Sequence, residues 1–216
     1  IPLRLVGSEM CIRDSTILEF CRSKMSAPQT LKNFIYASSS SVYGSNKKIP
    51  FSENDNTDRP VSFYGATKKA GEIMAQSYAH LYQIPSIGLR FFTVYGPWGR
   101  PDMSPYIFTK SILDGLPIRV FNKGEMMRDF TFIEDIVSGI IGALDTPPKA
   151  LNEIPPHRIY NLGNNKPVSL MDYINVIEKA CKKKAIIDLQ PMQPGDVIKT
   201  YADTNESERT LGYGPT

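Results

Sequence analysis

Two apolar segments with a long helical pattern between them constrain the fold of this chain most strongly. Residues 33–37 predict a buried strand that a run of serines ends, and residues 84–92 are apolar almost throughout. Residues 62–82 between them repeat apolar side chains at helical spacing. One face of this helix is expected to carry most of its apolar side chains. The residues near that face are Ala66, Ala70, Ile73, Met74, Ser77 and Leu81. A strand, helix and strand in this order favour an α/β fold with a doubly wound parallel sheet.

The chain divides into three regions by pattern. Residues 1–15 show no clean helical or strand period, and their string VGSEMCIRDS resembles an artefact of translated sequence assemblies. We therefore interpret them as a foreign leader, with a genuine N-terminal extension as the alternative. Residues 16–100 carry the strand–helix–strand pattern. Beyond the turn-rich GPWGRP run, residues 101–216 have shorter elements and more proline, which predicts a smaller α+β lobe.

The expected elements of this smaller lobe are short. They are helices at 105–114, 133–145 and 169–182, and strands at 118–121, 160–162 and 185–189.

The charge balance and the scarcity of metal-binding residues exclude several functions. Lys and Arg number 25 against 22 Asp and Glu, which is too balanced to indicate a nucleic-acid partner, although mild positive charge suits an anionic small substrate. No apolar run approaches the roughly 20 residues of a membrane helix, so a membrane partner is not expected. The 3 cysteines and 2 histidines lack ligand spacing, so we expect no metal site.

The strongest chemical motif is the run from Tyr64 to Lys68, YGATK. Residues four apart lie on one face of a helix, with about 6 Å between their Cβ atoms. An ammonium beside a phenol favours the phenolate, and such a tyrosine can serve as a general base near neutral pH. The motif alone is weak evidence, because Tyr and Lys at this spacing also form ordinary surface pairs.

A serine run at the end of the first predicted strand gives this motif its context. Residues 38–41 are all serine and follow the strand directly, at the edge where open α/β sheets bind ligands. A serine there can hydrogen-bond a reacting oxygen, although a polar turn explains the run equally well by itself. Strand-end serines, the YxxxK helix and then an apolar strand ending in LRFFTVYGP form a far more specific series.

This series resembles the extended short-chain dehydrogenase/reductase family, the NAD-dependent sugar-nucleotide epimerases and dehydratases, from about Thr16 to Tyr213. The runs YASSSSVYG, LYQIPSIGLRFFTVYGPWGRPDM and RDFTFIEDIVSGI are similar to UDP-glucuronate 4-epimerases. The resemblance implies part of a Rossmann-like NAD-binding domain over residues 16–100 and a substrate-binding lobe over residues 101–216. It also implies NAD as cofactor, a UDP-sugar substrate, a homodimer when full length and, for a bacterial source, a cytoplasmic location.

The same resemblance implies roles for individual residues. Tyr64 is the catalytic base, Lys68 tunes its phenolate and binds the nicotinamide ribose, and Ser39 falls on the catalytic Ser/Thr. Tyr64 and Phe91 are also expected to contact the cofactor. The residues expected to bind substrate are Ser40, Ser41, Thr93, Arg100, Phe121, Arg128 and Asp196.

Several of these roles compete with structural ones. Arg100 either holds a uronate carboxylate together with Thr93 or pairs with Asp102. Arg128 either binds the diphosphate or forms a salt bridge with a neighbouring acid. Phe121 either lies against the uracil ring or packs within the lobe. Asp196 is expected to bind the uridine ribose. In galactose epimerases an arginine assists the matching acid, and Gln193 stands in its place here, which weakens this assignment.

The implied function is NAD-dependent 4-epimerisation of UDP-glucuronate to UDP-galacturonate. Dehydratases of the family carry acids where Ser40 and Ser41 stand, which favours epimerisation. The alternatives are another nucleotide-sugar epimerase or dehydratase, or a nonenzymatic NAD-binding member. No GxxGxxG run enters a helix, so we expect a fragment that binds NAD poorly and turns over little alone.

Overall fold

The computed structural model describes residues 3–25, 31–193 and 196–216, with side chains from Ile12 onward. The helices are α1 (Leu3–Met25), α2 (Phe63–Tyr82), α3 (Ser104–Asp114), α4 (Ile133–Asp145), α5 (Leu170–Cys181) and α6 (Asn205–Leu211), with 3-10 turns η1 (Ser40–Tyr43) and η2 (Phe121–Gly124). The strands are β1 (Phe34–Ser39), β2 (Ser86–Phe91), β3 (Thr93–Tyr95), β4 (Pro117–Val120), β5 (Met127–Phe132), β6 (His157–Leu162), β7 (Pro167–Ser169) and β8 (Ile186–Leu189).

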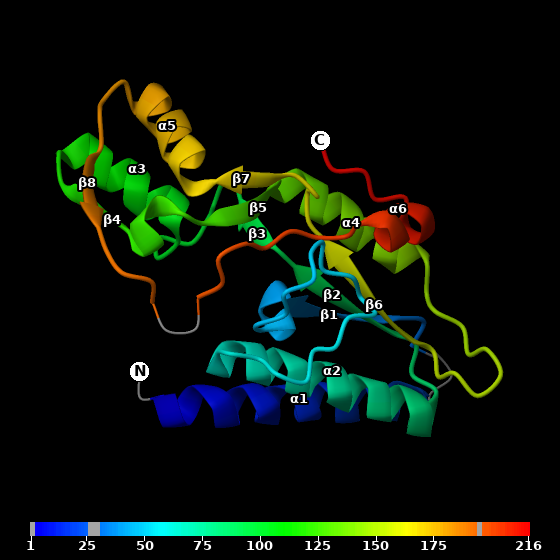
Figure 1. Cartoon of the computed structure of the whole chain (residues 1–216). Helices are drawn as coiled ribbons and strands as arrows, with labels where there is room; N and C mark the ends of the chain where they lie inside the picture. Colours follow the sequence, from blue (N-terminus) through cyan, green and yellow to red (C-terminus); the bar gives the residue numbers. More distant parts are fainter. Residues whose placement is uncertain (1–2, 26–30, 194–195) are drawn as a thin grey trace.

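Three parallel strands in the order β1-β2-β6 form the main sheet. Helices α1 and α2 lie on one side of this sheet, and α4 and α6 lie on the other (Figure 1). Between the sheet and α4, apolar side chains such as Leu89, Ile136 and Leu162 form a buried core. This arrangement confirms the expected α/β fold with a parallel, Rossmann-like sheet covered on both faces.

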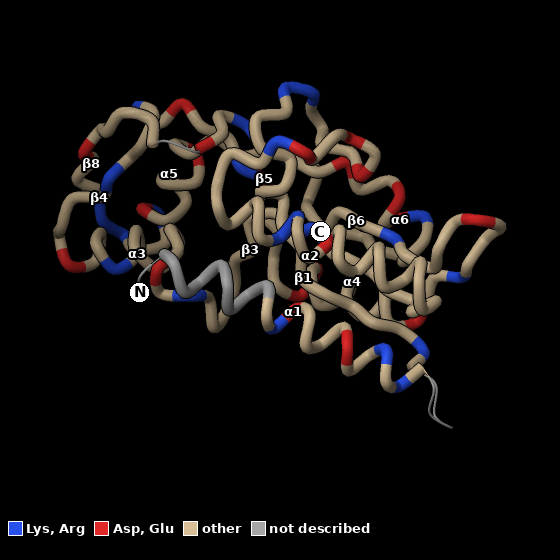
Figure 2. Tube along the Cα trace, turned by 90° about the horizontal axis from the view of Figure 1, so that it is seen from below, with Lys and Arg blue, Asp and Glu red and all other residues tan. Residues whose placement is uncertain are grey.

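A smaller lobe lies beside the main sheet. It contains the three-stranded sheet β3-β5-β7 and the parallel pair β4 and β8. Helices α3 and α5 pack together over a second buried core that includes Phe108, Ile118 and Ile174. Figure 2 shows β4, β8, α3 and α5 gathered at one end of the molecule, away from β1 and β6.

Strand β6 connects the two regions of the sequence. It lies within residues 101–216, which we expected to form the smaller lobe, yet it pairs with β2 along its whole length. Helices α4 and α6 also cover the main sheet (Figure 1). The chain therefore leaves the main sheet after β2, builds the smaller lobe and returns to complete the main sheet.

Strand β1 is half-buried rather than buried as expected. It forms one edge of the sheet, so only β2 pairs with it among the described strands. Phe34, Ile35 and Tyr36 are partly accessible, Ala37 is exposed, and burial begins at Ser38. Because no described strand lies along the outer edge of β1, its first residues are only partly covered, and Ile35 packs against the core beside α4.

The buried face of α2 also differs from the expected one. Ile73 and Leu81 are 57% and 63% exposed, whereas Ala75, Ala79 and the charged Glu72 are buried. The small alanines allow the helix to lie close to the sheet, and Glu72 is buried because an arginine of β2 binds it. Of the residues expected on one face, Ile73 and Leu81 therefore point outward, while Ala66, Ala70 and Met74 are half-buried.

Helix α1 spans residues for which the sequence shows no clear period. Leu18 and Cys21 are buried against the rest of the protein, while Ile17 is 47% exposed. The helix continues through residue 15, so a foreign leader over residues 1–15 stays a prediction. Among the helices that the structure describes, none combines the length and apolar character needed to cross a membrane.

Candidate active site

Tyr64 and Lys68 lie on the same side of α2, in its first turns. The helix begins after Ser62, whose hydroxyl accepts a hydrogen bond from the Gly65 N–H at 3.0 Å. The Lys68 ammonium lies 5.8 Å from the centroid of the Tyr64 ring. It also donates a hydrogen bond to the Ala37 carbonyl near the carboxyl end of β1, at 3.0 Å. The phenol is half exposed, so a ligand can reach it.

The serine turn, which comprises Ser39 and η1, lies against the first turn of α2. The buried Ser39 hydroxyl accepts the Ser41 N–H and lies 3.2 Å from the Ser41 hydroxyl. Ser40 and Ser41 are half-buried. A Cβ atom on Gly65 would lie 2.6 Å from the Ser41 carbonyl oxygen, which is too close for any side chain. Glycine beside Tyr64 therefore allows the serine turn to approach the tyrosine.

Phe91 and Thr93 extend the site along the end of β2. Phe91 is the residue of β2 that pairs in register with Ser39 of β1, which brings it beside the serine turn. Thr93 begins β3 two residues later, and both are half-buried. The main sheet therefore places the expected cofactor-side residue next to the expected catalytic serine.

Arg100 lies near Tyr64 but binds Asp102. Its Nε donates to Asp102 Oδ1 at 3.0 Å, and its Nη2 forms a second bond to the same carboxylate. The pKa of Arg100 is raised, mainly by this hydrogen bonding and the charge of Asp102, with a smaller contribution from Tyr64. Tyr64 is therefore within electrostatic range. In this structure Arg100 therefore forms the ion pair with Asp102 that was the alternative to binding a substrate carboxylate. Both side chains of the pair are largely exposed.

A hollow of about 440 Å³ lies beside Arg100. Its lining includes the aromatic side chains of Tyr95, Trp98 and Tyr106. These rings are all exposed, and Trp98 has no burial at all. The combination of flat apolar surfaces and one cation suits a polar ring compound that carries an acid group.

Arg128 lies on β5 in the smaller lobe and does not form the salt bridge that was the alternative to phosphate binding. Its Nη1 donates to the carbonyl oxygens of Met127 and Ile198, at 2.9 and 3.3 Å. Within the described part of the chain, no carboxylate forms an ion pair with it. Burial lowers the pKa of Arg128, and the charge of Asp196 opposes this, so Asp196 lies within electrostatic range.

Phe121 lies in the same lobe, half-buried at the start of η2. The structure thus divides the expected site residues into two groups. Tyr64, Lys68, the serine turn and Phe91 meet at the end of the main sheet, with Arg100 in electrostatic range of the tyrosine. Arg128, in the smaller lobe, lies within electrostatic range of Asp196.

Two buried charged residues that lie next to the site, Glu72 of α2 and Arg90 of β2, were not identified from the sequence. They form an ion pair with an Nε–Oε1 distance of 2.8 Å, and both side chains are 4% exposed. A charged residue within the apolar segment 84–92 was the available signal, since such a residue rarely stays buried without a partner.

A parallel α/β sheet with a tyrosine, a lysine and a serine turn at the carboxyl end of its strands defines the class of short-chain dehydrogenases/reductases. Residues 12–163 match the model of the NAD dependent epimerase/dehydratase family, and the chain belongs to this family.

Relatives of known name agree with this assignment. UDP-glucuronate 4-epimerase 3 of Arabidopsis thaliana is 47% identical over 93% of this chain and 48% of its own length. A probable UDP-glucuronate 4-epimerase of Rhizobium meliloti is 44% identical over 85% of this chain and 58% of its own length. The crystal structure of UDP-glucuronic acid 4-epimerase from Bacillus cereus, in complex with UDP-glucuronic acid and NAD, is 34% identical with a TM-score of 0.82. It aligns over 94% of this chain and 61% of its own. The chain thus spans about half to two thirds of its relatives' length.

The described residues fit part of an NAD site. The Ala37 carbonyl takes one of the three N–H donors of the Lys68 ammonium, which leaves two for ribose hydroxyls within the described part of the chain. Tyr64 is accessible beside it, and Phe91 lies at the same sheet edge. These three residues would hold the nicotinamide end of the cofactor, where it accepts and returns a hydride.

Proposed function

We propose that this chain supplies the catalytic residues of an NAD-dependent 4-epimerase that interconverts UDP-glucuronate and UDP-galacturonate. The observation that carries the proposal is the ammonium of Lys68, 5.8 Å from the ring centroid of Tyr64, in a helix packed against the serine turn. A tyrosine that exchanges a proton with the substrate must be accessible to it, and the Tyr64 ring is half exposed. The names of the relatives support the substrate.

The chemistry assigned to the chain is a reversible proton transfer at the 4-oxygen of the sugar. Tyr64 accepts the proton of the 4-hydroxyl while hydride leaves C4, and Ser39 donates a hydrogen bond to that oxygen. Bound NAD supplies the hydride acceptor and is regenerated within the cycle. The flat 4-keto sugar rotates before hydride returns to its opposite face, and Tyr64 then returns the proton to the oxygen.

Two arginines in this proposal bind the acidic groups of the substrate. Arg100 holds the uronate carboxylate with Thr93 beside it. Its pair with Asp102 is exposed and therefore weak, because water screens the two charges, so a substrate carboxylate can replace Asp102. Arg128 binds the diphosphate and Asp196 the uridine ribose, with Phe121 against the uracil ring. Ser40 and Ser41 complete the sugar site.

We also propose a homodimer formed through α1 and α2. These helices lie side by side on one face of the molecule (Figure 1) and carry exposed apolar side chains. Phe20, Ile73 and Leu81 are 57–63% exposed. A face with several large apolar side chains favours association, because burying them removes apolar surface from water.

The activity is tested in a chimaera in which residues 16–213 of this chain replace the matching segment of the Bacillus cereus epimerase. The purified chimaera is incubated with UDP-glucuronate or UDP-galactose, and the products are separated by ion-exchange chromatography. Formation of UDP-galacturonate without change of UDP-galactose is expected. Conversion of UDP-galactose alone, or of neither substrate, contradicts the proposal.

A further inference from the structure

Arg90, near the carboxyl end of β2, binds two elements of the candidate active site at once. Its Nε and Nη2 donate to the two carboxylate oxygens of Glu72 at 2.8 and 2.9 Å, and its Nη1 donates to the Tyr43 hydroxyl at 3.0 Å. Each of these three residues is at most 3% exposed. Three directional bonds made by one planar, buried guanidinium hold their partners in a defined geometry.

The two partners belong to the two parts of the site that must meet. Glu72 lies one helical turn after Lys68 on α2, the helix that carries the proposed base. Tyr43 is the last residue of η1 and so ends the serine turn. The Ser38 hydroxyl also donates to Glu72 Oε1, at 2.6 Å, so the residue just before Ser39 binds the same carboxylate.

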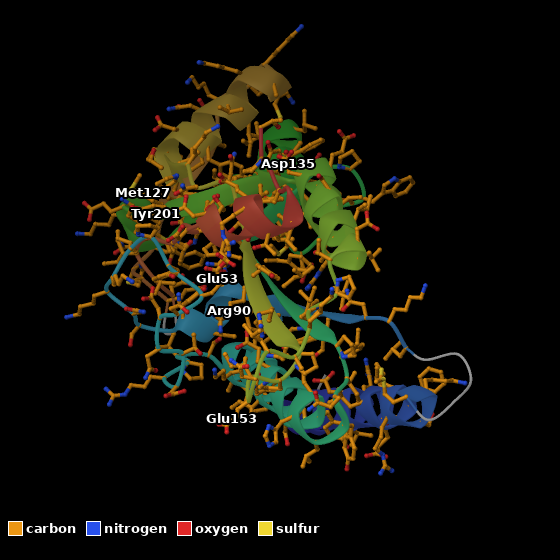
Figure 3. All side chains as sticks on the ribbon, turned by 90° about the vertical axis from the view of Figure 1, so that its right-hand side faces the viewer. Glu53, Arg90, Met127, Asp135, Glu153 and Tyr201 are labelled. Atoms are coloured by element: carbon orange, nitrogen blue, oxygen red, sulfur yellow. The ribbon has the colours of Figure 1, made fainter. Side chains whose placement is uncertain are left out.

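The network is anchored on its far side by β6 and by the loop that follows the serine turn. The Tyr43 hydroxyl donates to Asn161 Oδ1 at 2.7 Å, and its ring stacks on Phe51 with centroids 4.7 Å apart. Glu53 accepts the Asn161 N–H at 2.8 Å. Figure 3 shows Arg90 and Glu53 close together in the middle of the molecule. Arg90 is therefore held from several directions.

We infer that Arg90 is a positioning residue, which fixes α2 and its tyrosine and lysine relative to the serine turn. This inference rests on the proposed function of Tyr64. A buried ion pair is weak evidence for a stabilising role, because replacing both partners by apolar side chains is often neutral or stabilising. Displacing reacting groups by about 1 Å, in contrast, costs on the order of 100-fold in rate. The two roles therefore predict different results.

The decisive variant is Glu72→Met with Arg90→Met in the chimaera, because it removes both charges and leaves neither without a partner. We expect a melting temperature close to that of the parent, a kcat reduced by about 10-fold or more, and a KM for UDP-glucuronate within about threefold. A double variant that keeps both its stability and its kcat overturns the inference.

Tyr43→Phe tests the connection to the serine turn alone, since it keeps the stacked ring and removes only the hydroxyl. It is expected to lower kcat by about 3- to 10-fold at nearly unchanged KM. Tyr82→Phe, at the far end of α2, is the matched control and should have no effect. If the double variant does not fold, Tyr43→Phe decides, and an unchanged kcat contradicts the inference.

Hydrogen exchange on the 216-residue chain gives a readout that does not depend on turnover. In the double variant, the amides of η1 and of the first turn of α2 should exchange faster, while those of α5 in the smaller lobe stay unchanged. Unchanged protection in η1 overturns the inference.

The proposed function fails on different results, namely an inactive parent chimaera or an active Tyr64→Phe variant. In either case the hydrogen-exchange result still decides the role assigned to Arg90.

Discussion

Gly65 lies directly against the carbonyl oxygen of Ser41, so closely that a Cβ atom at residue 65 would be 2.6 Å from it. This contact joins the helix of the proposed base to the serine turn. Because the neighbouring atom is main chain, it cannot rotate away as the end of a side chain can. The distance between the two halves of the proposed catalytic group therefore depends on the absence of a side chain at this position.

Gly65→Ala is expected to lower kcat of the chimaera by about 10- to 100-fold and the free energy of unfolding by about 1–3 kcal/mol. Gly71→Ala on the same helix is the control. Its Cβ would meet only the end of the Asp14 side chain, at 3.2 Å, and alanine favours the helix. Steady-state kinetics and urea unfolding measure both. Equal activity of the two variants contradicts the account.

Substitutions of Arg100 and Asp102 should affect the KM for UDP-glucuronate differently. Arg100→Met removes the proposed carboxylate ligand and should raise KM for UDP-glucuronate by about 10- to 100-fold. Asp102→Asn removes the competing carboxylate and should leave KM equal or lower. Neither should change the melting temperature appreciably, because the pair is exposed. An unchanged KM in Arg100→Met would show that this residue does not hold the uronate.

Stability should fall below neutral pH because of one buried histidine. His157 lies 2.9 Å from the Tyr36 hydroxyl, and burial lowers its pKa to about 4. Unfolded histidine titrates near 6.5, so between pH 4 and about 6.5 the unfolded state binds more protons and the free energy of unfolding rises with pH. About 3 kcal/mol should be lost as the pH falls from 7 to 4.

The control for this titration is His157→Gln, which keeps a hydrogen-bond partner for Tyr36. Burial raises the pKa of Glu53, which gives stability the opposite pH dependence, but Glu53 is common to both proteins. The difference between the two urea-unfolding profiles therefore isolates His157. Parallel profiles from pH 4 to 7 would contradict the prediction.

Charges on the outer face of α2 should prevent the proposed dimer. Ile73→Lys with Leu81→Lys is expected to convert the chimaera to a monomer in sedimentation velocity, since it places cations among apolar side chains. Gln76→Lys, at an exposed polar position of the same helix, is the control and should remain dimeric. A dimer that persists in the double variant excludes this face as the interface.

Local pattern predicts the regular elements of this fold well. Periodicity places a helix at residues 133–145, the bounds that α4 has, and places α2, α3 and α5 within one or two residues. Strands β3, β5 and β7 are missed. They are only 3–6 residues long, and β5 buries Asp129, whose carboxylate accepts the N–H groups of Asn164, Asn165 and Ala202. No local pattern reveals such distant donors.

The motif likewise predicts which residues meet, but not what orients them. The spacing of Tyr64 and Lys68 is enough to place both on one side of α2. The orientation of that helix depends on Glu72 and Arg90, which are 18 positions apart and belong to different elements. Hydrophobic periodicity therefore assigns Ile73 to the core, whereas the buried ion pair turns it toward the surface.

The role of the Tyr64 phenol is tested most directly by Tyr64→Phe in the chimaera, with turnover of UDP-glucuronate and NAD content measured on the same samples. Removing one hydroxyl from a half-exposed ring should leave the melting temperature unchanged. Lys68 and Phe91 should still hold NAD, and kcat is calculated per bound NAD. The account predicts that kcat falls by about 100- to 10,000-fold, the usual contribution of a general acid–base group. A variant that binds NAD and keeps most of its turnover would contradict it.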